Sequence, residues 1–420
     1  MVIIIQKTRK LISIILCFMF MTISVTSEAK EYDLTNDINN VLEYLEQHYD
    51  ADGTHPLLEM MSSDVLTPVA DWAAFCAALS GEAESREVYL NALSDKISEL
   101  YKTDSLLDRN RATEWHRTIF AITALGGDPY SFSSNKNGKP INLIADGIYN
   151  RGKIASLGKQ GLIGWIYGLL TAASLDVDFP EDAYYNYSDL VNEITSKQLA
   201  DGGFKMSGNS ADADVTAMAV QALALYDNRQ GEKTLTQNIK NAINCLSDLQ
   251  NDDGSFSSLG EPTAESTAQV IIALCISEIN PSVDERFIKN GNSAIDALLS
   301  FRQDDGGFSH IQTGNSDGLA TVQSMLALLS CQKFIEKKAT IFDLSITETS
   351  NVESLNESYI TESKTANTSD IDESRIENQS ITTQLVITFA VIMIIAAAVI
   401  IISNRFRRSD KNQTKKEKTR

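Results

Sequence analysis

Two aspartates separated by one residue, Asp212 and Asp214, stand directly before the apolar run 215–223. A carboxylic acid can serve as a general acid when burial and a neighbouring partner make its proton available. The same position also suits a residue that caps a helix or interacts with its dipole. Glu265 occupies the equivalent place before the next apolar run. Asp212, Asp214 and Glu265 are therefore the catalytic candidates. The capping role is the alternative, because a unique proton donor would not need a copy at Glu265.

Three tryptophans form a second set of candidates. Trp72, Trp115 and Trp165 each fall in the first turns of an apolar helical run, and Asp71 and Glu114 stand directly before two of them. If these helices stand side by side, their first turns share one cavity mouth with aromatic walls and a few polar groups, which is typical of a small-ligand site. The alternative is that the indole rings only fill the wide end of the helical assembly.

The histidines and cysteines do not indicate a metal centre. Zinc needs three or four convergent ligands, and the chain has only four histidines: His48, His55, His116 and His310. His310 stands alone in its segment and is expected to be a solvated loop residue. The cysteines outside the N-terminal segment lack close metal-ligand spacing, and they are Cys76, Cys245, Cys275 and Cys331. They fit core positions, and a disulfide among them cannot be paired from the sequence. We expect no metal and no cofactor.

A repeated turn organises the chain that carries these residues. Phe204, Phe256 and Phe308 are spaced by 52 residues, and each ends a Gln–Asp–Gly-type motif. A period of this size indicates one supersecondary unit stacked on copies of itself. The glycines supply the positive φ that ends a helix, and the phenylalanine fills the seam. The structural turn residues are Gln198, Gly202, Gly203, Phe204, Gln250, Gly254, Phe256, Gln303, Gly306, Gly307 and Phe308.

Each turn lies between an amphipathic outer helix and an almost wholly apolar inner helix. Weaker copies upstream bring the number of hairpins to six. The expected outer and inner segments are 33–49 with 69–79, 84–101 with 112–125, 141–149 with 161–174, 187–199 with 215–223, 238–249 with 266–274, and 294–302 with 320–328. Six hairpins with buried inner helices predict an all-α fold, an (α/α)6 toroid over residues 31–338. An open solenoid is the competing arrangement, but it would leave two apolar ends.

The two ends of the chain predict export and a membrane anchor. Residues 1–29 show the basic, apolar and small-residue order of a secretory signal peptide. Residues 347–380 are rich in Ser, Thr, Asn and Glu and are expected to form a disordered stalk. Residues 385–402 are uncharged and long enough to be one C-terminal transmembrane helix, and the basic tail 403–420 should stay in the cytoplasm. The expected location is the cell membrane, single-pass, with the toroid outside. The net charge of −20 argues against nucleic acid as a partner.

These turns resemble the repeats of the prenyltransferase and squalene-cyclase superfamily. The segments Asp71-Trp72-Ala-Ala-Phe75, Ser210 to Ala217 and Glu265 to Val270 look most like bacterial surface proteins of that superfamily. Those proteins are also similar to the helical domain of the animal cobalamin carriers. The resemblance implies an (α/α)6 toroid with a central cavity. It does not by itself imply an activity.

The superfamily that these turns resemble includes several chemistries. Terpene cyclases carry Asp-x-Asp-Asp-Thr-Ala where this chain has Asp212-Ala-Asp214-Val215-Thr216-Ala217, so Asp214 matches the proton donor and Val215 departs from the pattern. Only 7% of the residues are aromatic, although carbocation chemistry needs aromatic walls. The Asp-Cys-His zinc set of protein prenyltransferases and the Cys-Gly-Glu-Gln thioester motif are absent. A carbohydrate-active carboxylate pair is a further alternative.

The sequence thus predicts a non-enzymatic surface module that binds an extracellular small molecule, glycan or protein. The alternative is a terpene-cyclase-like or carbohydrate-active enzyme that uses Asp214.

Overall fold

The computed structural model describes residue 30 and residues 32–49, 55–103, 106–231, 233–336 and 340–345. The predicted signal peptide, stalk, transmembrane helix and basic tail lie outside these residues. Within the described ranges, no helix is both long and apolar enough to cross a bilayer. The chain divides into the units Met1–Ile346 and Thr347–Arg420, and all of the described residues belong to the first unit.

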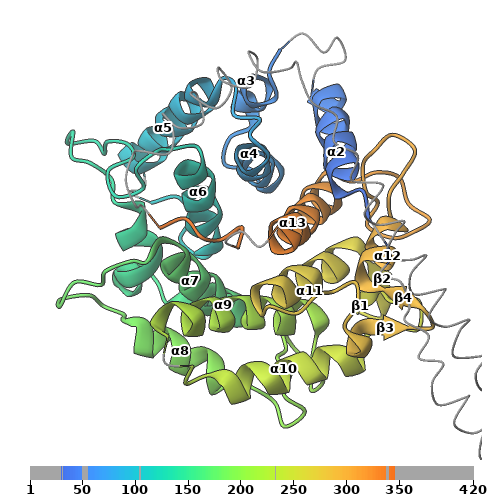
Figure 1. Cartoon of the computed structure of the whole chain (residues 1–420). Coiled ribbons are helices and arrows are strands. Elements are labelled where there is room, and N and C mark those ends of the chain that lie inside the picture. Colours follow the sequence, from blue (N-terminus) through green and yellow to red (C-terminus); the bar gives the residue numbers. More distant parts are fainter. Residues whose placement is uncertain are drawn as a thin grey trace, which may run out of the picture. The chain divides into compact units, whose positions relative to one another are not determined.

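Six inner helices form a closed ring (Figure 1). They are α4 (Pro68–Ser80), α6 (Thr113–Ala124), α7 (Leu162–Leu175), α9 (Ala213–Gln230), α11 (Ala264–Ile276) and α13 (Gly318–Ile335). Each one contacts the next, and α13 contacts α4. The predicted ring of inner helices is therefore confirmed, and the open solenoid is excluded.

An outer layer surrounds this ring. It consists of α2 (Leu34–Tyr49), α5 (Arg86–Thr103), α8 (Tyr187–Thr195), α10 (Thr236–Leu249) and the short α12 (Ala294–Leu299). Helices α8, α10 and α12 pack on the inner helix that precedes them, and α2 packs on α13. Shorter pieces join the hairpins: α3 (Leu57–Met60), η1 (Met61–Asp64), η4 (Leu157–Gln160) and η5 (Glu285–Phe287).

The third hairpin differs from the prediction. Its outer part is a π-helical turn, η2 (Ala145–Tyr149), followed by a 3-10 turn, η3 (Arg151–Lys153), rather than an α-helix. Gly147 lies so close to the inner layer that a Cβ there would come within 2.6 Å of the Trp115 Cβ. Two short antiparallel hairpins were also not predicted: β1 (Phe256–Ser258) with β2 (Glu261–Thr263), and β3 (Ile288–Lys289) with β4 (Asn292–Ser293).

The repeated turn has the same geometry in all three copies. Gly202, Gly254 and Gly306 each have a φ of +88°, as predicted. The phenylalanine that follows is fully buried, and its backbone N–H donates to a threonine hydroxyl in the next inner helix, 2.9 Å from Phe204 to Thr216. The turn therefore ties the end of an outer helix to the start of an inner one.

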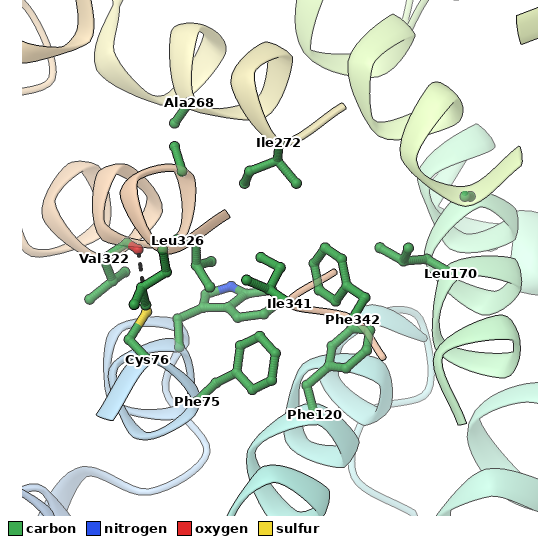
Figure 2. Close-up of a cluster of buried hydrophobic side chains, with 14 of the residues drawn as sticks. Phe75, Cys76, Phe120, Leu170, Ala268, Ile272, Val322, Leu326, Ile341 and Phe342 are labelled. Carbon is green, nitrogen blue, oxygen red and sulfur yellow. Dashed lines mark hydrogen bonds between the residues drawn. The ribbon is translucent and has the colours of Figure 1, made fainter. Parts of the chain in front are cut away.

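The centre of the ring is filled by the protein's own side chains. After α13 the chain returns to the ring as residues 340–345, called here the central plug. Ile341 and Phe342 are 0% and 2% exposed, and Figure 2 shows them among side chains from the surrounding inner helices. The Phe342 ring centroid lies 5.2 Å from that of Phe120 and 6.0 Å from that of Phe75. The compact unit thus extends past the predicted boundary at Lys338, because the plug completes its core.

Polar contacts hold the plug from one side. Leu344 N–H donates to the carbonyl oxygen of Ser174 at 3.0 Å. The Arg229 guanidinium bonds the Asp343 carboxylate at 2.5 Å and the same Ser174 carbonyl at 3.2 Å. Ser174 and Arg229 lie in the last turns of α7 and α9, so these contacts hold the plug where inner helices end.

Candidate functional site

Asp212 caps helix α9. Its backbone is extended, and its Oδ1 accepts a hydrogen bond from Val215 N–H at 3.0 Å. Thr67, Thr263 and Asp317 cap α4, α11 and α13 in the same way. Asp212 therefore has the local role that its position before an apolar run indicates.

Asp214 lies in the first turn of α9 and borders a recess of about 570 Å³ at the rim of the ring. The loop 206–212, the first turns of α9, the end of α10 and the β1–β2 hairpin form its walls. The lining side chains are either apolar or small and polar, and the main ones are Met206, Met218, Leu249, Leu259, Ser207, Ser210, Ser257 and Ser258. We call this the acidic recess, since Asp212 and Asp214 both line it.

Burial raises the pKa of Asp214 to about 6. Hydrogen bonding with Ser266 and Ser258 opposes this rise, whereas the nearby charges of Asp212 and Glu265 add to it. Asp214 Oδ1 is enclosed and has no hydrogen-bond partner among the described residues. A carboxylate in this state is poised either to bind a cation or to hold a proton.

Glu265 lies in the first turn of α11, close enough to influence Asp214, but its carboxylate is bonded to His310. The distance from His310 Nδ1 to Glu265 Oε2 is 2.9 Å. His310 is largely exposed, as expected for a loop residue, although it is not isolated. A zinc site would need at least one further donor beside this pair. The described residues contain no group of three or more His, Cys, Asp or Glu side chains placed to hold a metal ion.

Asp71 and Glu114 lie close together because both carboxylates form ion pairs with Arg117, a buried arginine of the core. Arg117 Nε lies 3.0 Å from Asp71 Oδ2, and Arg117 Nη2 lies 2.6 Å from Glu114 Oε2. Asp71 is fully buried and also accepts hydrogen bonds from Tyr89 and Thr118. These partners occupy the Asp71 carboxylate, so in this structure it serves to hold α4, α5 and α6 together.

The structure places the three tryptophans in separate environments, which differs from the shared mouth expected for them. Trp72 joins the aromatic cluster at the ring centre, 5.8 Å from the Phe120 centroid. Trp115 is fully buried and faces the outer layer, where its Nε1 donates to the Tyr101 hydroxyl at 3.0 Å. Trp165 packs edge-on against Tyr185 beside a shallow recess of about 250 Å³.

Sequence reasoning missed two exposed apolar side chains of the acidic recess. Leu259 is 100% exposed at the tip of the β1–β2 hairpin, and Met206 is 58% exposed on the facing loop. The dipeptide Leu259-Gly260 indicates a turn, but only the hairpin places it beside Asp214. A second recess, of about 880 Å³, lies where α9, α11 and α13 end. We call it the helix-end recess, and the plug residues Thr340 and Asp343 form part of its wall.

Comparison with known proteins agrees with this architecture. Residues 151–357 match the family model of the prenyltransferase alpha-alpha toroid domain. Together with the closed ring and the repeated turn, this match shows that the chain carries a prenyltransferase-like α/α toroid domain. The matched range contains the three turn motifs that predicted this domain, at residues 198–204, 250–256 and 303–308.

Solved structures with some likeness to the chain include two in particular. Candida albicans protein geranylgeranyltransferase-I complexed with GGPP is 15% identical with a TM-score of 0.47, over 75% of this chain and 97% of that chain. A protein from Actinoplanes is 12% identical with a TM-score of 0.43, over 72% of this chain and 100% of that chain. A search of curated proteins found no match.

Proposed function

We propose that this protein is a non-catalytic binding module, displayed on the cell surface, that receives its ligand in the acidic recess. The observation that carries the proposal is the filled ring. Phe75, Phe120 and Phe342 pack together at its centre, whereas Asp214 lines a recess at the rim. A volume of about 570 Å³ is within the usual range of small-ligand sites.

The chemistry of the recess favours a ligand with a cationic group and a short apolar body. Asp214 and Asp212 both line the recess and give it a negative potential. An ammonium or guanidinium group would stabilise the charged form of Asp214 that burial disfavours. Met206 and Leu259 offer exposed apolar surface for the rest of the ligand. The basic side chain of a protein partner would supply the same cationic group and apolar stem as a small amine.

Display on the surface rests on the sequence of the chain ends. The signal peptide 1–29, the transmembrane segment 385–402 and the basic tail 403–420 agree on one orientation, with the toroid outside. A stalk over 347–380 would hold the domain away from the bilayer. On this proposal the ligand is extracellular.

One observation favours the enzymatic alternative. The raised pKa and enclosed Oδ1 of Asp214 suit a general acid. The described residues that line the acidic recess include no aromatic side chain, however, and stabilisation of a carbocation depends on such walls. We therefore assign Asp214 a role in binding.

The binding proposal is tested with the full chain in nanodiscs, using hexylammonium as the probe and hexanol as its neutral match. Calorimetry or ligand-observed NMR should detect saturable binding of the amine alone. Asp214→Asn should weaken it by about tenfold or more, since a charge-assisted hydrogen bond contributes about 1.5–3 kcal/mol. Glu87→Gln, which removes the same charge from the exposed face of α5, should leave binding unchanged. Equal affinity of the wild type and Asp214→Asn would refute the proposed site.

Display is tested separately by protease treatment of intact cells. Release of a soluble fragment that contains the toroid, with cuts inside 347–380, is the expected result. Detection of the toroid only after the cells are lysed would contradict surface display, whatever the outcome of the binding test.

A further inference from the structure

Two cysteines from neighbouring inner helices face each other. Cys275 lies near the end of α11 and Cys331 near the end of α13, and their sulfur atoms are 3.8 Å apart. The two helices pack directly against one another. The other two described cysteines have no such neighbour: Cys76 Sγ bonds the carbonyl oxygen of Val322, and all four thiols are free. The structure thus brings two of these free cysteines close together, which the sequence could not predict.

Access to the pair is one-sided. Cys275 is 8% exposed and lines the helix-end recess, which has a volume of about 880 Å³. Cys331 is 2% exposed and is not among the residues that line it. A small molecule in the recess would therefore meet Cys275 first, with Cys331 directly behind it.

We propose that Cys275 and Cys331 form a dithiol site that reacts with small-molecule disulfides entering the helix-end recess. In the first step the Cys275 sulfur, after losing its proton, attacks a disulfide R–S–S–R. A bond forms between Cys275 and one R–S group, and the other leaves as a thiol with the released proton. In the second step the Cys331 sulfur, losing its own proton, attacks Cys275 in this mixed disulfide. The second R–S group takes up that proton and leaves as a thiol, and a Cys275–Cys331 disulfide remains.

The environments of the two sulfurs support this order. The contact with Cys275 and complete burial raise the pKa of Cys331 well above its ordinary value. The raised pKa lowers the thiolate fraction of Cys331, and its burial screens it from a free oxidant in the recess. It becomes competent only when a mixed disulfide on Cys275 brings an electrophilic sulfur to within its reach. This division gives Cys275 the role of the attacking residue and Cys331 that of the resolving residue.

The product would link two elements of the ring that are far apart in the sequence. Closing the bond needs the sulfurs to approach from 3.8 Å to about 2.05 Å. The cross-link spans 56 residues, including α12 and the turn at Gly306. Such a loop should raise the Tm of the chain by about 5 °C or more. The inference does not depend on the acidic recess or its ligand.

The test uses the full chain, reduced and then exposed to oxidised glutathione. In the wild type, peptide mapping should find Cys275 joined to Cys331, and the intact mass should fall by two hydrogen atoms. Cys331→Ser should stop at glutathione attached to Cys275. Cys275→Ser should slow modification of Cys331 by about tenfold or more, because Cys331 is screened from the recess.

Three further variants keep the test decisive. Cys76→Ser removes an equally buried thiol and should still form the cross-link at the wild-type rate. Cys275→Ala and Cys331→Ala repeat the measurement with apolar replacements if either serine variant fails to fold. The proposal is overturned if the wild type gives no Cys275–Cys331 peptide, or if Cys331 is modified as fast without Cys275 as with it.

Discussion

A Cβ atom on Gly306 would lie 2.5 Å from the carbonyl oxygen of Asn40. Gly306 belongs to the last repeated turn and Asn40 to α2, the first outer helix, so this approach joins the two ends of the ring. A Cβ atom on Gly202 would likewise lie 2.5 Å from the carbonyl oxygen of Asn241 in α10. The last repeat therefore packs on the first outer helix through the same kind of glycine contact that joins the internal repeats.

We expect Gly306→Ala to lower the free energy of unfolding by roughly 2–4 kcal/mol. The alanine would be forced into a positive φ, which costs about 1–2 kcal/mol, and its Cβ would also push α2 away. Gly208→Ala is the matched control, because Gly208 has a φ of +72° but no described atom within 4 Å of an added Cβ. Chemical denaturation measures both. Equal losses would mean that φ alone matters and that the close approach does not.

The central plug gives a second prediction. Phe342→Ala should lower the free energy of unfolding by about 3–5 kcal/mol, because it empties a fully packed site at the ring centre. Ile335→Ala, at a position that is 53% exposed, should change it by less than about 0.5 kcal/mol. Truncation after Lys338 should destabilise the domain at least as much as Phe342→Ala. A truncated chain with unchanged Tm would show that the plug does not belong to the core.

The repeats were predictable because their determinants are local. The Gln–Asp–Gly–Phe turn specifies its own φ angles, and the apolar runs after it specify buried helices, so a spacing of 52 residues sufficed to predict the hairpins. The plug was not predictable. Ile341 and Phe342 form a two-residue apolar pair without periodicity, and their burial depends on a ring built by the rest of the chain.

The candidate site was predictable only in part, for a related reason. Asp212 and Asp214 were placed correctly at the start of α9, since a helix start is a local feature. Which way Trp115 and Trp165 face depends on the rotation of each helix against its neighbours, and the sequence pattern did not fix it. The outer part of the third hairpin shows the same limit, because close packing of Gly147 on Trp115 accompanies a π-helical turn there.

Arg117 provides a third prediction. Replacing it with methionine should lower the free energy of unfolding by about 3–5 kcal/mol, because the fully buried Asp71 carboxylate would lose its counter-charge. Lys96→Met breaks the exposed pair with Glu99 and should change stability by less than about 1 kcal/mol. Denaturation curves of both variants give the comparison. A small loss for Arg117→Met would mean that the Asp71 network is not a main support of α4 and α6.

The final prediction concerns the pH dependence set by Asp214. Its pKa is about 6 in the folded chain, against an ordinary value of 3.8. Between these two values the folded state binds more protons than the unfolded state, so the contribution of this group to stability falls as the pH rises. The destabilisation caused by ionising the buried Asp214 carboxyl group is absent below about pH 4 and fully present above about pH 6. Asp214→Asn removes it, and should therefore stabilise the chain by on the order of 2 kcal/mol at pH 7.5 but not at pH 4.

Hexylammonium supplies the control for this effect. By pairing with the carboxylate, it should stabilise the wild type at pH 7.5 and reduce the advantage of Asp214→Asn, and it should do neither at pH 4, where Asp214 is protonated. Glu87→Gln should show no such pH-dependent gain. A gain for Asp214→Asn that is the same at both pH values would contradict the raised pKa, and with it the proposal that the acidic recess holds an unpaired carboxylate.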